Sequence, residues 1–213
     1  MPARLRPTAP VAADAILVGD PGRALMLAQE LLEQPKMSNH ARGLWGYSGA
    51  TPAGHELTVQ STGMGGPSAT VVLDDLAELG VRRAIRIGTG AGLSDIGLGE
   101  LLVVTEARTE AGAASQPDRE LTGQLEKALD EAQLGVAVSL DALHDPERHS
   151  PTLLADAADM QTAALLAAGA HLNVALAVVL IITERSDSGQ LRDEELEALV
   201  KQAGAVAASL LSP

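Results

Sequence analysis

The chain has 213 residues, of which 46% are hydrophobic and 20% charged, so it can bury one sizeable core and we expect a single domain over residues 1–213. Only Trp45 and Tyr47 are aromatic, which argues against stacking platforms for single-stranded nucleic acid. Its 15 basic and 28 acidic residues give a net charge of −13, which repels a phosphate backbone and excludes nucleic acid as a partner.

Short apolar runs alternate with longer helical patterns along the chain, which is typical of an α/β protein. We therefore expect a single-domain three-layer α/β/α fold with a central mixed, mostly parallel twisted sheet. The predicted strands are 15–18, 45–47, 55–61, 84–87, 101–104, 135–140 and 174–183. The predicted helices are 23–32, 68–79, 118–133, 153–170 and 192–211. The run 174–183 is apolar on both faces and is predicted to be central.

Neither a metal site nor a membrane segment is expected. The chain has no cysteine, and no two of its five histidines stand at ligand spacing. The most apolar run, 174–182, is too short to cross a bilayer, and the N-terminal apolar stretch 15–18 is too short for a signal sequence. We expect a cytoplasmic protein.

Three glycine-rich junctions follow three predicted strands, at 19–23, 63–68 and 88–92. In an α/β sheet such junctions meet at the carboxyl edge, where backbone N–H groups and helix starts can hold an anion. Each junction alone is weak support, because any turn between a strand and a helix needs Gly or Pro.

Arg86 is the sharpest anomaly, since it lies inside the apolar strand 84–87 directly before Gly88. A guanidinium is expensive to bury unless an anion or a set of hydrogen bonds satisfies it. An edge-strand position or a structural ion pair would also explain it, but the neighbouring Thr89 hydroxyl leads us to favour a ligand contact. Arg23 lies in the first turn of a predicted helix, where a positive charge interacts unfavourably with the helix dipole, and a bound anion would remove that penalty.

The strings Gly-Asp-Pro-Gly-Arg at 19–23, Ser-Thr-Gly-Met-Gly-Gly-Pro-Ser at 61–68 and Arg-Ile-Gly-Thr at 86–89 resemble the signatures of the nucleoside phosphorylase family, which includes uridine phosphorylase and the hexameric purine nucleoside phosphorylases. The three motifs occur in the family's order. The resemblance runs from about 14 to 106 and more weakly from 135 to 185. It implies a pentosyltransferase with inorganic phosphate as co-substrate and no cofactor.

The resemblance also implies a division of labour among residues. It assigns phosphate binding to Gly19, Arg23, Arg86 and Thr89, together with Arg42, which would cross a dimer interface into the neighbour's site. It therefore implies a homo-oligomer built from dimers, commonly a hexamer. Converging guanidinium and N–H groups would aim one phosphate oxygen at C1′ of the sugar.

The sugar and base contacts depart from the family pattern. The resemblance places Met64, Met160 and Gln161 at the ribose, but Gln161 stands where the family has a glutamate, and an interior structural role fits it equally well. It places Leu143 and Arg148 at the base, although a charged surface loop is the better explanation of 146–148. Glu184 would protonate the leaving base, with Asp187 as a second candidate; an exposed strand end is the plain alternative.

Three hypotheses follow from these residues. The first is a nucleoside phosphorylase, for which we favour uridine and other pyrimidine nucleosides on the 61–68 string and Arg148. The second, supported by Glu184, is a purine nucleoside phosphorylase. The third, of another class, is a degenerate paralogue that binds phosphate or nucleoside without turnover, because the departures lie at the sugar and base while the phosphate motifs are intact.

Overall fold

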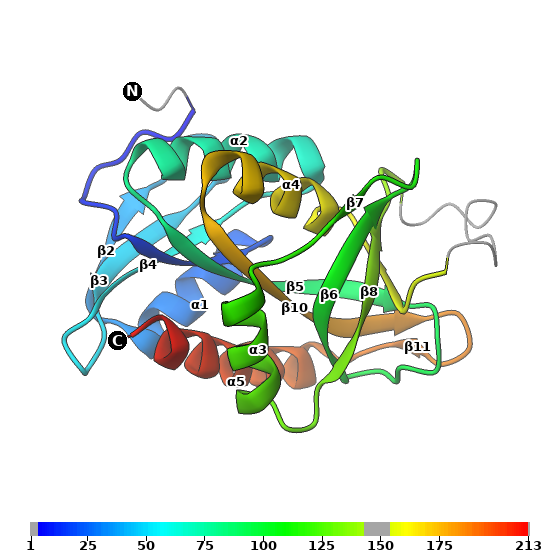
Figure 1. Cartoon of the computed structure of the whole chain (residues 1–213). Coiled ribbons are helices and arrows are strands. Elements are labelled where there is room, and N and C mark those ends of the chain that lie inside the picture. Colours follow the sequence, from blue (N-terminus) through cyan, green and yellow to red (C-terminus); the bar gives the residue numbers. More distant parts are fainter. Residues whose placement is uncertain (1–3, 143–153, 213) are drawn as a thin grey trace.

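The computed structural model describes residues 4–142 and 154–212. An 11-stranded mixed sheet forms its centre and helices cover both faces (Figure 1), so the predicted fold class is confirmed. The strands are β1 (Asp14–Val18), β2 (Glu33–Asn39), β3 (Gly46–Ala50), β4 (Glu56–Ser61), β5 (Arg83–Gly92), β6 (Leu101–Thr109), β7 (Ala114–Ser115), β8 (Gln133–Ser139), β9 (Ala157–Asp159), β10 (Ala175–Arg185) and β11 (Gly189–Gln190). The helices are α1 (Pro21–Leu31), α2 (Gly66–Glu78), α3 (Arg119–Ala128), α4 (Thr162–Leu172), α5 (Asp193–Leu211) and the short 3₁₀ helix η1 (Ala41–Gly43).

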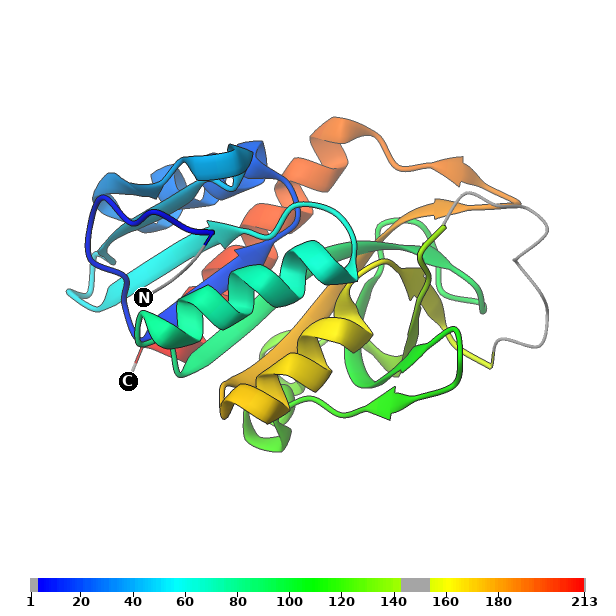
Figure 2. The ribbon, with the colours of Figure 1, turned by 90° about the horizontal axis from the view of Figure 1, so that it is seen from above.

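Two hydrophobic cores lie on opposite faces of the sheet. Helices α2 and α4 run side by side over one face (Figure 2), where Leu73, Leu76 and Leu166 pack against strand residues such as Leu17. Helices α1, α3 and α5 cover the other face with Leu27, Leu125 and other aliphatic side chains. Because the core holds almost no aromatic residues, its density depends on the close fit of Ala, Val, Leu and Ile.

The sheet places four strand ends at one edge. Strands β4, β1, β5 and β10 are mutually parallel neighbours, so their carboxyl ends lie together. Beyond this, β5, β10, β6, β8 and β9 pair in a closed ring, because β10 and β9 both pair with β5. The closure brings β9, which runs antiparallel to β5, to the same edge.

Three sequence predictions need correction. The predicted helix 153–170 begins only at Thr162, and 157–159 is the strand β9, because pairing with β5 and β8 overrides the helical propensity of alanine. Strand β2 was not predicted, since its sequence Glu-Gln-Pro-Lys-Met-Ser-Asn is polar, as an edge strand can be. The glycine-rich segment 88–92 is no turn but the end of β5.

No helix within 4–142 and 154–212 combines the length and the apolar character that crossing a membrane requires. Over the same residues, no group of three His, Asp or Glu side chains is arranged to hold a metal ion.

Candidate functional site

The three glycine-rich segments meet at the carboxyl edge of the sheet, as the sequence predicts. The last residue of β1, Val18, pairs in register with Ser61 of β4 and Ile87 of β5. The segments that follow these three residues therefore start side by side at the same edge of the sheet. The Thr62 N–H donates to the Val18 carbonyl oxygen at 2.7 Å. A methyl group on Gly19 would lie 3.5 Å from the Gly63 carbonyl oxygen, which shows how closely the first two segments approach.

Two helices begin at this edge. Asp20 caps α1 by accepting a hydrogen bond from the Arg23 backbone N–H at 2.9 Å, and Pro21 occupies the first helical position. Helix α2 starts at Gly66. The residue before it, Gly65, has a φ of 80°, which is unfavourable for a residue with a side chain. The positive ends of the two helix dipoles therefore lie at this edge and favour an anion, although in α1 Asp20 already takes the Arg23 N–H and Pro21 has none.

Arg86 is buried beneath this edge, with only 4% of its surface exposed. Its Nη1 donates to Gln161 Oε1 at 2.7 Å, and its Nη2 donates to Asp159 Oδ2 at 3.1 Å. The Nε–H is buried and has no hydrogen-bond partner. The ion pair considered from the sequence is thus present, and it uses only part of the donor capacity of a guanidinium, which has five N–H groups.

Gly88 lets this guanidinium fold back along the strand. A methyl group on Gly88 would lie 2.8 Å from Arg86 Nη2 and 3.0 Å from Arg86 Cζ. Gly90 has a related role, since a methyl there would lie 2.8 Å from the Ala158 carbonyl oxygen of β9. The glycines of β5 therefore serve close approach rather than a turn.

Arg23 adds a second cation next to Arg86. Burial lowers the pKa of the half-buried Arg23 guanidinium, Asp20 offsets part of that shift, and the positive charge of Arg86 lowers the pKa further. Two guanidinium groups close enough to repel each other would be stabilised by an anion between them.

Gln161 holds this edge together. Its Oε1 accepts from Arg86 and lies 3.0 Å from the Thr62 hydroxyl donor. Its Nε2 donates to the carbonyl oxygens of Gly63 at 2.6 Å and Gly65 at 3.4 Å. An amide offers two acceptor sites and two N–H donors, and here all of them face protein partners. The ribose contact predicted for Gln161 stays a prediction.

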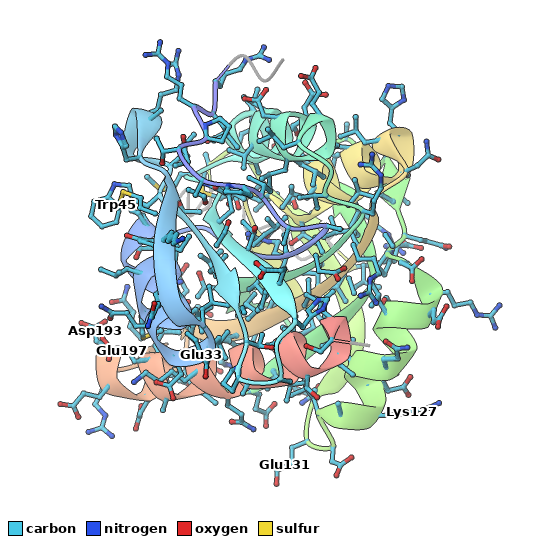
Figure 3. All side chains as sticks on the ribbon, turned by 90° about the vertical axis from the view of Figure 1, so that its left-hand side faces the viewer. Glu33, Trp45, Lys127, Glu131, Asp193 and Glu197 are labelled. Atoms are coloured by element: carbon cyan, nitrogen blue, oxygen red, sulfur yellow. The ribbon has the colours of Figure 1, made fainter. Side chains whose placement is uncertain are left out.

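The other phosphate residues lie at different depths. Thr89 is partly exposed on β5 beside the end of β10, where it pairs with Ile181. Arg42 is exposed in η1 with φ of 59°, a left-handed conformation that is uncommon for arginine. Trp45, three residues later, projects from the margin of the molecule (Figure 3), so the Arg42 segment is on the surface that a second subunit could reach.

Glu184 lies at the end of β10 and is half-buried. It pairs with Ala91 of β5 after a register shift at Ile182 and with Gln190 of β11. The neighbouring Arg185 donates to the backbone carbonyl oxygens of Ser94 and Ile96, which fastens this strand end to the segment after β5.

The predicted sugar residues lie near the same edge. Met64 is 84% exposed in the loop before α2. Met160, between β9 and α4, borders a cavity of about 440 Å³. The cavity is lined by Gly66, Thr109, Glu110, Ala111, Ser139, Asp141, Met160, Ala163 and Ala164. The predicted base residues Leu143 and Arg148 lie outside the described residues.

Two residues of this edge were not predicted from the sequence: Asp159, which pairs with Arg86, and Ser139, whose hydroxyl donates to Asp159 Oδ1 at 2.6 Å. The only signal for Asp159 was an acidic residue within an alanine-rich apolar segment directly before Met160.

The family model of the phosphorylase superfamily matches residues 14–212. The chain belongs to this superfamily. The family predicted from the three motifs is thereby confirmed.

Individual relatives align with most of the chain or with about half of it. The chain is 30% identical over 206 residues to a DeoD-type purine nucleoside phosphorylase of Alkaliphilus metalliredigens, covering 87% of this chain and 88% of that protein. A DeoD-type purine nucleoside phosphorylase of Oceanobacillus iheyensis is 40% identical over 102 residues, which cover 46% of this chain and 43% of that protein. The crystal structure of a Toxoplasma gondii purine nucleoside phosphorylase with immucillin-H superposes with a TM-score of 0.80 at 21% identity, covering 94% of this chain and 90% of that one.

Proposed function

We propose that this protein is a nucleoside phosphorylase, a pentosyltransferase that uses inorganic phosphate to cleave the N-glycosidic bond of a purine nucleoside. The observation that carries the proposal is Arg86, a buried guanidinium beneath the edge where Arg23 and the starts of α1 and α2 lie. Membership of the phosphorylase superfamily supports it.

In the proposed reaction a phosphate oxygen forms a bond to C1′ as the bond from C1′ to the base nitrogen breaks. The electron pair of that bond leaves with the base, which takes up a proton, and the products are free base and ribose 1-phosphate. Arg86, Arg23 and the helix N-termini would bind and orient the phosphate. The bound anion would also stabilise the positive charge that develops on the sugar.

The remaining roles are assigned on position. Glu184, half-buried at the end of β10, would supply the proton to the leaving base. Thr89 would add a hydroxyl donor to the phosphate, and Arg42 of a second subunit would complete the site in a homo-oligomer. Met64 and Met160 would pack against the sugar.

The relatives favour purines over the uridine preference expected from the sequence, since those compared carry the name purine nucleoside phosphorylase. The uridine preference rested on the 61–68 string and on Arg148, which lies outside the described residues. Pyrimidine specificity therefore stays the second choice.

A binding protein without turnover is the alternative of another class. It is favoured by one observation: the Gln161 amide, predicted to contact ribose, is occupied by four protein partners. Without that contact, the sugar would be held more weakly.

The deciding experiment measures release of base from inosine and from uridine, each with and without phosphate. Faster release from inosine in the presence of phosphate would support the proposal. Equal rates with and without phosphate would indicate a hydrolase, and phosphate binding by calorimetry without cleavage of either nucleoside would indicate the binding protein.

Arg86→Gln supplies the matching variant. It keeps most of the side-chain volume but removes a buried charged donor worth about 2–5 kcal/mol, so phosphate-dependent activity should fall by roughly 30-fold to several thousand-fold. Arg82→Gln is the matched control and should retain activity. Arg82 is exposed, and its guanidinium donates to the backbone carbonyl oxygens of Ala77 and Val81.

A further inference from the structure

Asp159 is a buried carboxylate to which neither the sequence motifs nor the proposed reaction assign a role. It ends β9 with 1% of its surface exposed. Besides Arg86, it accepts hydrogen bonds from the Ser139 hydroxyl at 2.6 Å, the Thr162 hydroxyl at 2.6 Å and the Thr162 backbone N–H at 3.0 Å. These donors come from the end of β8 and the start of α4.

The position of this carboxylate is therefore set independently of Arg86. Neutral donors from two elements hold both carboxylate oxygens, because Ser139 binds Oδ1 and Thr162 Oγ1 binds Oδ2. Asp159 is thus a fixed point against which the long and flexible arginine side chain is aligned.

The alignment leaves the guanidinium in one orientation. Asp159 accepts from Nη2 and Gln161 accepts from Nη1, each of which carries a second N–H, while the Nε–H is buried without a hydrogen-bond partner. The positive charge of Arg86 also acts on Arg23, whose pKa it lowers, and the Asp159 carboxylate counters that charge at the guanidinium itself.

We propose that Asp159 is a positioning residue for phosphate binding, which holds the Arg86 guanidinium in the orientation that binds the anion. This inference rests on the proposed function. It predicts that loss of the Asp159 charge weakens phosphate binding and leaves nucleoside binding unchanged.

The test is Asp159→Asn, which removes the charge at nearly constant volume. Calorimetry with inorganic phosphate should show binding weakened roughly 10- to 100-fold, and the KM for phosphate should rise in parallel while the KM for nucleoside stays within about twofold. Asp14→Asn is the matched control. Asp14 is also buried and bonded to an arginine, with 2.7 Å from Arg83 Nε to Oδ1, but it lies at the opposite, amino end of β1.

A double-variant cycle separates positioning from a general loss of structure. In an Arg86→Gln background, Asp159→Asn should cost less than about threefold in phosphate affinity, because there is no guanidinium left to orient. An equal loss in both backgrounds would overturn the proposal. So would wild-type phosphate affinity in Asp159→Asn, or an equal loss in the Asp14→Asn control.

Ser139→Ala covers the case in which Asp159→Asn does not fold. It removes one of the donors that fix Asp159 and touches neither Arg86 nor the charge, so phosphate binding should weaken by a smaller factor, about threefold to tenfold, with the nucleoside KM unchanged. Unchanged phosphate binding in Ser139→Ala would then overturn the inference. Failure of the proposed function looks different, because the wild-type protein would itself lack phosphate-dependent cleavage.

Discussion

Substitution of Gly88 by Ala tests whether the fold-back of Arg86 matters. The added methyl would lie 2.7 Å from Leu180 Cδ2 and 2.8 Å from Arg86 Nη2, both well inside ordinary van der Waals contact. The Arg86 guanidinium and the Leu180 side chain would have to shift, and we expect the shift to disturb the 3.1 Å bond from Arg86 Nη2 to Asp159. Overpacking of this kind destabilises a fold by about 1–3 kcal/mol.

The assay has two parts. Urea unfolding should give a free energy of unfolding lower by about 1–3 kcal/mol, and phosphate-dependent kcat/KM should fall roughly 10- to 100-fold through displacement of the guanidinium. Gly123→Ala is the control, because nothing lies within 4 Å of that methyl and the helix α3 should gain up to about 1 kcal/mol. Wild-type phosphate kinetics in a folded Gly88→Ala protein would refute the reasoning.

Three further outcomes are expected. Mixing Arg42→Ala with Arg86→Gln subunits should restore activity, since one site of each mixed dimer carries neither lesion; proven exchange without recovery would refute the shared site. Gln161→Glu should lower the free energy of unfolding by about 1–3 kcal/mol in urea, because a carboxylate replaces the N–H donors to two backbone carbonyls; equal or higher stability would contradict this. Pairing with Arg185 lowers the pKa of Asp187 in the folded protein. The ionised Asp187 therefore stabilises the fold at a pH above the ordinary aspartate pKa of about 4, and this stabilisation is lost as the pH falls toward the lower pKa of the folded state. The stability advantage over Asp187→Asn in acid titrations should therefore shrink below that pH, and a constant difference would be inconsistent with it.

Local pattern predicted most of the elements and the edge at which the site lies. The apolar runs 15–18 and 174–183 are strands β1 and β10, and the second of these pairs with both β5 and β6 as a central strand should. Glycine and proline marked the strand exits correctly at Gly19 and Gly63, because turns and helix starts have local backbone requirements. The three motifs together identified the family.

Tertiary structure alone decided which side chains meet. Arg86 was visible as an anomaly, but its partner Asp159 lies 73 residues away and is reached only because β9 closes the ring against β5. The same closure made a strand of 157–159 where alanine favours a helix, and it made glycine necessary at position 90 of β5. Backbone propensity acts over a few residues, whereas pairing between distant strands depends on the whole sheet, so the orientation of the Arg86 guanidinium could not be predicted from the sequence.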